Sequence, residues 1–258
     1  MIDQIDVEEL IRISRAAGEA ILEVYGTEFS VDVKDDSSPL TEADRKANEV
    51  IVSALTAAYP DIPVISEETK TLEYSERKDW EYFWLVDPLD GTKEFVKRNG
   101  EFTVNIALIH RDTPVMGFVY QPVGDRLFWG IVGKGAWSIT GEGKPQELKG
   151  GPHYSEKDKV VVVASRSHLT KDVQDFVADL EAQGKTVEFL SAGSSLKLCL
   201  VAEGTADVYP RLGPTMEWDT GAAHAVALAS GRKVVSQESG EALLYNKENL
   251  LNPFFFVE

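Results

Sequence analysis

Hydrophobic residues recur at helical spacing in two stretches near the start of the chain. In residues 5–25 one face is lined by leucine, isoleucine, valine and alanine, and Gly26 follows as a natural helix end. A second apolar face begins after Thr41, which forms with Asp44 a sequence typical of a capping box. The pattern predicts two amphipathic helices. The polar residues 32–40 between them have no periodicity, and we expect a mobile loop there.

The middle of the chain follows the pattern of strands. Residues 102–109, 115–121 and 126–132 are rich in β-branched and aromatic side chains, and short turns with proline or glycine separate them. Such short connections predict antiparallel neighbours.

The second half alternates between the two kinds of element, which predicts helices packed on a sheet. Strands are expected at 160–164, 187–190, 206–209 and 254–257, and helices at 170–182, 194–203 and 219–230. Residues 139–158, rich in glycine, lysine, glutamate and proline, are the clearest break in composition. They predict a boundary between an N-terminal α+β domain, residues 1–150, and a C-terminal α/β domain, residues 151–258.

Two carboxylates follow an expected buried strand at residues 82–86. Asp87 and Asp90 come directly after its apolar and aromatic residues. Pro88 lacks a backbone donor and Gly91 permits a sharp bend, so we expect the strand to stop and turn here. Two anionic groups held together repel unless a cation lies between them, and a hard divalent cation is the usual partner. The alternative is a plain hairpin turn at Asp90 and Gly91.

Further acids lie at the ends of other expected elements. Glu67 and Glu68 follow a short apolar stretch, residues 62–65, and Asp219 precedes a run of small apolar residues. Each has an ordinary explanation, as loop acids in solvent or as a helix N-cap. Together with the two aspartates of the central turn, they favour a site for divalent cations.

The composition narrows the class of partner. The chain has 258 residues, 43% of them hydrophobic, with a formal net charge of −17 and a pI near 4.7. So acidic a protein is not expected to bind a nucleic-acid polymer, because basic residues must neutralise a phosphate backbone. A small anionic substrate remains compatible with this charge if bound metal supplies the positive charge.

Cys199 is the only cysteine, which excludes a disulfide within the chain, and its apolar neighbours predict a buried thiol. No stretch is long and apolar enough to span a bilayer, and the first residues are acidic where a signal peptide is basic. We therefore expect a cytoplasmic protein. Peripheral association with the inner face of the cell membrane stays open, and the sequence carries no signal for the oligomeric state.

Three motifs resemble those of the inositol monophosphatase superfamily of Mg²⁺-dependent, lithium-sensitive phosphatases. They are S-E-E at 66–68, W-L-V-D-P-L-D-G-T-K-E-F at 84–95 and W-D-T-G-A-A at 218–223. Within this superfamily, the segments 100–107, 165–168, 193–197 and 209–211 resemble the 3′(2′),5′-bisphosphate nucleotidases of the CysQ type. The resemblance covers nearly the whole chain. It implies a layered αβαβα sandwich of the inositol monophosphatase and fructose-1,6-bisphosphatase type, with the active site between the two halves.

The resemblance also implies a set of metal ligands. Glu67, Asp87 and Asp90 would hold one Mg²⁺ with the help of the Leu89 carbonyl, and Asp90 and Asp219 would hold a second. Two or three ions per active site are expected. Mg²⁺ prefers octahedral coordination by oxygen, which these carboxylates and the carbonyl provide. Because it keeps several waters, this small number of protein ligands per ion is sufficient.

The same resemblance assigns the catalytic group. Thr92, hydrogen-bonded to Asp44, would orient and deprotonate the attacking water, with Glu67 beside it, and attack would be direct. Helix capping alone would also account for Asp44. The backbone N–H groups of Gly91 and Thr92 would bind the phosphate. Three further histidines lack the spacing of metal ligands and are expected to be structural or exposed: His110, His153 and His224.

Substrate choice would depend on Arg211. Inositol monophosphatases have a glutamate there, which accepts hydrogen bonds from polyol hydroxyls, whereas a guanidinium binds a second phosphate. Ser194 and Lys197, at the expected start of a helix, can bind the same phosphate, although Lys197 can instead be a solvated lysine. Further substrate contacts are expected from Asp219.

Two segments each allow two roles. Ser165 and His168 would lie near the nucleoside, or His168 would cap the following helix. Lys34, in the polar segment, can face a phosphate or solvent.

The expected activity is removal of the 3′-phosphate of 3′-phosphoadenosine 5′-phosphate to give AMP, and action on the sulfated nucleotide, in sulfur assimilation. One alternative is an inositol-phosphate or sugar-phosphate phosphatase of the same fold. Another is a non-catalytic regulator that binds Mg²⁺ or nucleotide. The complete set of acids argues against the regulator.

Overall fold

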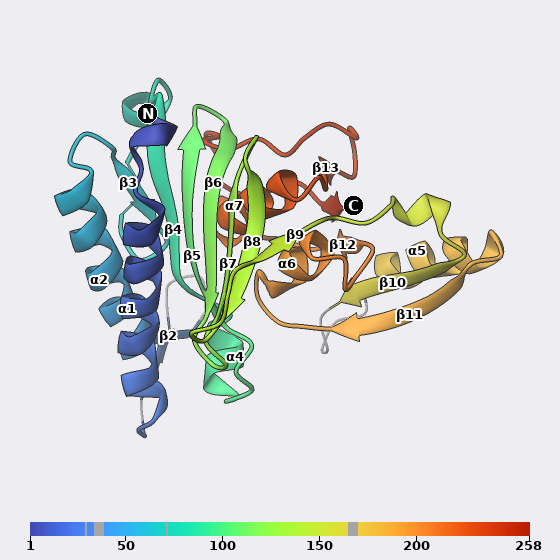
Figure 1. Cartoon of the computed structure of the whole chain (residues 1–258), viewed down its shortest axis with the longest axis horizontal. Coiled ribbons are helices and arrows are strands. Elements are labelled where there is room, and N and C mark those ends of the chain that lie inside the picture. The colour runs from blue at the N-terminus through green and yellow to red at the C-terminus, as the bar shows by residue number, and fades with distance from the viewer. Residues whose placement is uncertain (29, 34–38, 71, 165–169) are drawn as a thin grey trace.

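A seven-stranded sheet forms the framework of the chain (Figure 1). The computed structural model describes residues 1–28, 30–33, 39–70, 72–164 and 170–258. The strands lie in the order β3 (Val64–Ser66), β4 (Tyr82–Asp90), β5 (Thr103–His110), β6 (Thr113–Gln121), β7 (Arg126–Ile131), β8 (Gly135–Thr140) and β9 (Gln146–Leu148). The first pair, β3 and β4, is parallel, and all other neighbours are antiparallel, as the short turns predicted.

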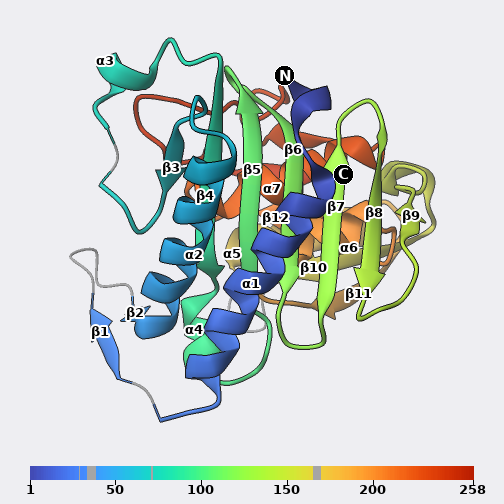
Figure 2. The ribbon, with the colours of Figure 1, turned by 60° about the vertical axis from the view of Figure 1, so that its left-hand side comes forward.

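Two predicted helices, α1 (Val7–Tyr25) and α2 (Glu42–Ala58), lie side by side on one face of this sheet (Figure 2). Gly26 ends α1 and Thr41 caps α2, as the sequence predicted. A short 3₁₀ helix, Ile2–Gln4, precedes α1. The apolar faces of both helices and of the sheet form one buried core, because each amphipathic face removes the other from water.

The polar segment between these helices is partly a strand pair. The strands β1 (Val31–Val33) and β2 (Pro39–Thr41) are antiparallel, with Val31 opposite Thr41. The expected loop over residues 32–40 is therefore wrong at both ends. Three-residue strands held by backbone hydrogen bonds are too short to leave a period in the sequence. Lys34 lies outside the described residues.

Helix α7 (Glu217–Ala229) covers the opposite face of the sheet, and α6 (Leu196–Ala202) packs beside it (Figure 1). The small side chains of α7 allow this helix to approach the sheet closely. A Cβ atom added to Gly117 would overlap the Ala222 carbonyl, and one added to Gly130 would lie 2.7 Å from Val226 Cα. This tight packing holds the middle of α7 directly against the sheet, and the helix begins two residues earlier than predicted.

The remaining strands form smaller sheets. The parallel pair β10 (Lys159–Ala164) and β11 (Thr186–Ser191) is covered by α5 (Lys171–Ala182). The strands β12 (Tyr209–Arg211), β14 (Phe255–Val257) and β13 (Val234–Ser236) form an antiparallel sheet in that order. The short helices are α3 (Tyr74–Arg77), α4 (Thr92–Val96) and the 3₁₀ turn Tyr154–Glu156.

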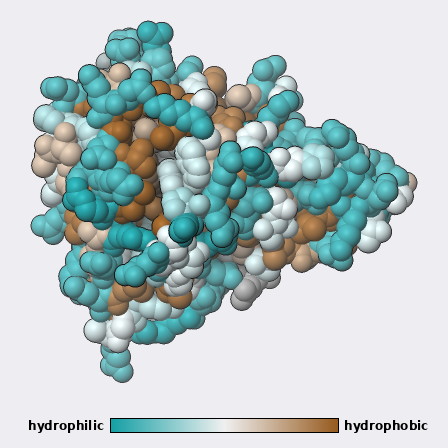
Figure 3. Space-filling view, viewed as in Figure 1, coloured by the Kyte–Doolittle hydropathy of each residue, from teal (hydrophilic) through white to brown (hydrophobic). Residues whose placement is uncertain are grey.

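The layers follow one another as helices α1 and α2, the large sheet, helices α6 and α7, the β10–β11 sheet and helix α5 (Figure 1). This arrangement confirms the predicted αβαβα sandwich. Helix α7 belongs to the second half of the chain and packs on the sheet of the first, and the boundary near residue 150 stays a prediction. Hydrophilic side chains cover most of the right-hand end of the molecule, around a smaller apolar patch (Figure 3), and Phe189 on β11 is 52% exposed. No described helix has both the length and the apolar character needed to cross a membrane.

Candidate active site

Strand β4 carries both central aspartates. The expectation that the strand stops after Val86 is wrong, because it continues to Asp90. Its register shifts between Asp87, opposite Asn105, and Asp90, opposite Thr103. Residues three apart on a regular strand point to opposite faces, and the bulge between them turns both side chains toward the same cavity. The bulge also accommodates Pro88, which has no N–H group for the ladder.

Gly91 turns the chain from β4 into helix α4. Its φ of 88° is in the left-handed region that favours glycine, and the helix begins at the next residue. The hairpin alternative for this turn is therefore wrong. A Cβ atom here would lie 3.3 Å from both the Glu101 carbonyl oxygen and Ser194 Cβ, so the loop before α6 packs directly against this turn.

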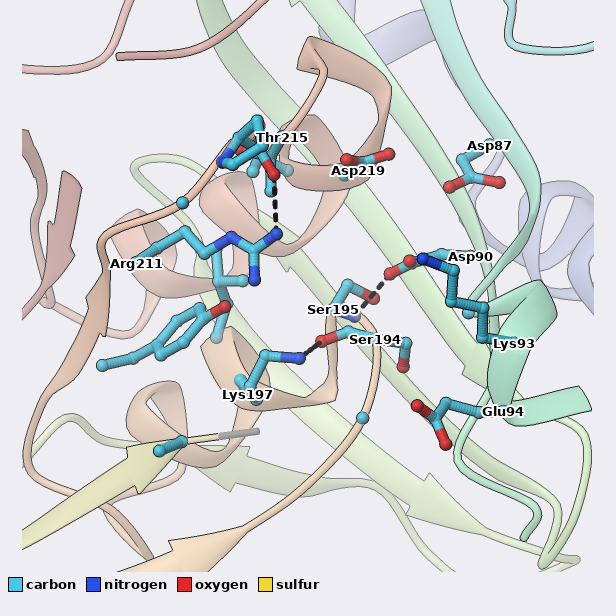
Figure 4. A pocket seen from close by; sticks show the side chains of 18 of the residues that line it. Asp87, Asp90, Lys93, Glu94, Ser194, Ser195, Lys197, Arg211, Thr215 and Asp219 are labelled. Atoms are coloured by element: carbon cyan, nitrogen blue, oxygen red, sulfur yellow. Dashed lines mark hydrogen bonds between the residues drawn. The ribbon is translucent and has the colours of Figure 1, made fainter. Parts of the chain in front are cut away.

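A cluster of three acids forms next to this turn, and two of them, Asp87 and Asp219, are labelled in Figure 4. Glu67 follows β3, and its N–H group donates to the Val86 carbonyl at 3.1 Å, so the parallel pairing continues and brings it beside Asp87. Asp219 is the third residue of α7 and accepts a hydrogen bond from Met216 N at 2.9 Å, so it is not the N-cap. Carboxylate oxygens of Glu67, Asp87 and Asp219 all lie within 4.8 Å of one another.

The electrostatics of this cluster call for a cation. Burial, followed by the charges of Glu67 and Asp90, raises the pKa of Asp87 well above its usual value. Burial and the charge of Asp90 raise the pKa of Asp219 to about 8. Burial also raises the pKa of Asp90, although Lys197 opposes it. Buried and partly buried acids that repel one another and offer oxygen ligands fit divalent cations such as Mg²⁺.

Asp44 caps helix α2 and also contacts Thr92. Its Oδ2 accepts from the Thr41 N–H at 2.7 Å and from the Thr41 hydroxyl at 2.6 Å, which completes the capping box. Its Oδ1 lies 3.2 Å from Thr92 Oγ1, which donates to it. The Leu89 carbonyl lies 3.4 Å from the same hydroxyl. Both neighbours are acceptors, so the Thr92 hydroxyl proton is directed to this side. The lone pairs of the hydroxyl oxygen are left to accept from another donor.

Two cationic side chains lie across the cavity from Asp90 (Figure 4). Lys197 is only 6% exposed, so the solvated alternative is wrong, and its ammonium group donates to the Ser194 carbonyl at 2.7 Å. Arg211, on β12, donates through Nη2 to the Pro214 carbonyl at 2.7 Å. Its Nε is buried without a hydrogen-bond partner among the described residues. A buried guanidinium N–H of this kind favours an anionic ligand.

Except for Asp44, which is connected to it through Thr92, the predicted residues that the structure describes line one cavity of about 580 Å³. The described members are Glu67, Asp87, Leu89, Asp90, Gly91, Thr92, Ser194, Lys197, Arg211 and Asp219. Ser165 and His168 lie outside the described residues. The sequence analysis missed Tyr209 and Phe255, which form part of an apolar wall, although Tyr209 is in the segment 209–211 that carried the resemblance.

The other reactive side chains are separate from this cavity. His224 is buried and hydrogen-bonded to the Tyr245 hydroxyl at 2.9 Å, and burial lowers its pKa to about 3. His110 stacks on Tyr82, and His153 contacts Ser155. Cys199 is fully buried, and burial raises the pKa of its thiol. These contacts agree with the prediction that the three histidines are structural or exposed, and the prediction of a buried thiol is confirmed for Cys199.

A five-layer αβαβα sandwich with a buried acidic cluster in a cleft defines a class of metal-dependent proteins. The sequence profile of the inositol monophosphatase family matches residues 3–253, so the chain belongs to that family. The family is metal-dependent, which agrees with the oxygen-rich cluster.

The chain is similar to named relatives over almost its whole length. It is 44% identical to the 3′(2′),5′-bisphosphate nucleotidase CysQ of Salmonella typhimurium over 97% of this chain and 98% of that protein. The crystal structure of CysQ from Bacteroides thetaiotaomicron is 48% identical, with a TM-score of 0.86 over 97% of this chain and 96% of that chain. An IMPase/NADP phosphatase complexed with Mg²⁺ and phosphate shares the fold, with 19% identity and a TM-score of 0.73 over 94% and 86% of the two chains.

Proposed function

We propose that the chain hydrolyses the 3′-phosphate of 3′-phosphoadenosine 5′-phosphate to give AMP and phosphate, and accepts the sulfated nucleotide as well. The observation that supports this is the division of the cavity, with carboxylates at one end and Lys197 and Arg211 at the other. A substrate with two phosphates can place one beside the carboxylates and their metal ions and the other beside Lys197 and Arg211. A monophosphate would leave the Arg211 guanidinium without an anionic partner. The names of the similar nucleotidases support the same assignment.

The proposed ligands of two or three Mg²⁺ ions are Glu67, Asp87, Asp90 and Asp219, with the Leu89 carbonyl. When bound, Mg²⁺ neutralises the phosphate, activates water and stabilises the leaving oxygen. The protein holds these ligands at the ends of two paired strands of the large sheet and on the helix that packs on it, so their oxygens stay close despite their repulsion.

Thr92 and Asp44 are the proposed proton-transfer pair. The Thr92 hydroxyl proton is directed to Asp44, which leaves its oxygen free to accept a proton from water. Asp44 is held in place by two hydrogen bonds from Thr41 and is 1% exposed, so the pair is rigid. Glu67 lies at the same end of the cavity and is proposed to orient the same water.

The two phosphates have separate proposed binding groups. The backbone N–H groups of Gly91 and Thr92 hold the phosphate that is cleaved. Arg211, Lys197 and Ser194 hold the second phosphate. Asp219 contacts the sugar near the leaving oxygen. Ser165 and His168 are proposed to contact the nucleoside.

The test is phosphate release from 3′-phosphoadenosine 5′-phosphate and from inositol 1-phosphate, each with Mg²⁺ and with EDTA. For Arg211→Ala we expect KM for the nucleotide to rise about 10- to 100-fold, the loss of one charged hydrogen-bond group, with little change for inositol 1-phosphate. Arg12 is an exposed arginine on α1, so Arg12→Ala is the matched control and should change KM for neither substrate.

Two results would contradict the proposal. Inositol 1-phosphate cleaved as well as the nucleotide by the wild type would leave the fold assignment intact and refute the substrate. Tight nucleotide binding in calorimetry with no phosphate release in Mg²⁺ would instead indicate the non-catalytic regulator.

A further inference from the structure

A buried network of three polar side chains lies directly behind Asp90. Thr103 and Asn105 are on β5, and Ser195 is the residue before α6. All three are at most 2% exposed. They come from two segments, 100–107 and 193–197, that carried the family resemblance, but none of the roles proposed above uses them.

The hydrogen bonds of this network have a single consistent direction. Ser195 Oγ donates to Asn105 Oδ1 at 2.8 Å. A hydroxyl has only one proton, so the Thr103 hydroxyl, 2.8 Å from Ser195 Oγ, must be the donor in that contact. Because Ser195 occupies the carbonyl oxygen of the Asn105 side chain, the amide is fixed with its NH₂ group toward Asp90 Oδ2, at 3.5 Å.

Asp90 receives a second donor from the same network. The backbone N–H group of Ser195 donates to Asp90 Oδ2 at 2.5 Å. Among the described residues, both hydrogen bonds to the Asp90 side chain therefore end on Oδ2. This leaves Oδ1 as the oxygen that can serve a ligand in the cavity, which Asp90 lines.

The network also connects the acids to the cationic side of the cavity. Ser195 is flanked by Ser194, whose carbonyl accepts from the Lys197 ammonium group at 2.7 Å. A three-residue path therefore joins the Asp90 carboxylate to the lysine proposed to bind the second phosphate. A displacement of Ser195 would move both groups together.

We propose that Asn105 and Ser195 are positioning residues that fix the Asp90 carboxylate with one oxygen free, through the ordered chain of donors from Thr103 to Ser195 to Asn105. This inference rests on the proposed metal-dependent reaction, because the free oxygen is useful only to a cation. The network lies outside the ligand set and acts only through Asp90 and the segment before α6.

The first measurement is Mn²⁺ binding to the metal-free full-length protein, by calorimetry and by electron paramagnetic resonance, without substrate. For Asn105→Ala we expect the affinity for Mn²⁺ to fall about 10- to 100-fold, as for other groups that orient a metal ligand. Ser14→Ala is the matched control, since this buried hydroxyl donates to the Leu10 carbonyl on α1 and is remote from the site. It should bind Mn²⁺ like the wild type.

A double-mutant cycle tests the order of the chain. Ser195→Ala keeps the backbone N–H group and removes only the hydroxyl that fixes the Asn105 amide. If Ser195 acts through Asn105, adding Ser195→Ala to Asn105→Ala will cost little further affinity, so the two effects will not add. Additive effects would overturn the ordered chain.

Two further outcomes would overturn the proposal. Affinity for Mn²⁺ that stays within about twofold of the wild type in Asn105→Ala, with a lowered urea midpoint, would show a purely structural network. A wild type that does not bind Mn²⁺ would refute the metal site and this inference together. If the wild type binds Mn²⁺ but does not hydrolyse the nucleotide, only the substrate assignment fails, and the affinities of the variants still decide the roles of Asn105 and Ser195.

Discussion

Helix α7 holds two carboxylates, two positions apart, in opposite environments. Glu217 is fully buried and accepts hydrogen bonds from the backbone N–H groups of Asn246 and Lys247, at 2.7 and 3.0 Å. The Lys247 ammonium lies 2.5 Å from its Oε1. Asp219 is bound by one backbone N–H group, that of Met216, among the described residues, and faces other carboxylates.

The difference separates a structural acid from a functional one. Burial raises the pKa of Glu217, but the charge and hydrogen bonds of Lys247 oppose the rise. For Asp219 burial and the nearby Asp90 act in the same direction. A protein that neutralises one buried acid and leaves its neighbour among like charges has a site that is completed by a ligand.

The largest expected effect is on the functional side. Asp87→Asn should lower the rate of nucleotide hydrolysis by about 10³-fold, because it removes a charged ligand at the reaction centre. In EDTA the same variant should be more stable to urea than the wild type, because one of several repelling buried charges is gone. Asp112→Asn, an exposed turn residue, is the control for both assays. A variant that is less stable in EDTA would mean that Asp87, like Glu217, is a paired structural acid.

For the structural acid Glu217, removing its cationic partner should lower the stability of the protein. Lys247→Met leaves Glu217 buried and unpaired, and we expect a loss of about 3 kcal/mol in the free energy of unfolding, with or without Mg²⁺. The matched control is Lys149→Met, whose partner Glu147 is exposed, with an expected loss of less than about 1 kcal/mol. Equal losses in the two variants would remove the distinction between buried and exposed pairs.

The pH dependence of the metal-free protein should be the smallest effect. The pKa of Asp219 is about 8 in the folded chain, above its usual value of 3.8, so the folded state holds its proton where the unfolded state has lost it. Stability in EDTA should therefore decrease as the pH rises from about 4 to 8. Urea unfolding across this range measures how steeply the free energy of unfolding falls with pH. Asp219→Asn should make this fall less steep. A slope unchanged in Asp219→Asn would show that this group is not the one titrating.

The sequence predicted elements well wherever a period or cap was long enough to see. Helices α1 and α2, with Gly26 and Thr41 at their ends, and the antiparallel strands β5 to β7 are as expected. The end of β4 was predicted wrongly, because proline and glycine signals do not distinguish a turn from a bulge that the neighbouring strand supports.

The sequence identified acids that follow predicted strands as candidate metal ligands. It did not identify the side chains that surround these acids in the folded protein. Asp87 and Asp219 were identified from their positions in the chain, and Lys197 could not be separated from a solvated lysine until its burial was known. Asn105 and Ser195 gave no signal of their own, because a single polar residue at a strand or helix end is ordinary. Their role depends on a contact between residues 90 positions apart.

The sequence by itself determined the amphipathic helices, the longer strands and helices that follow them, and the kinds of oxygen ligand available, because periodicity, capping and charge are local properties. Only the tertiary structure decided which carboxylates gather in one cluster. That outcome depends on the bulge in β4, the parallel pairing of β3 and the close packing of α7 on Gly117, which together bring distant acids into one buried space. Burial and electrostatic repulsion are properties of that space and not of any segment.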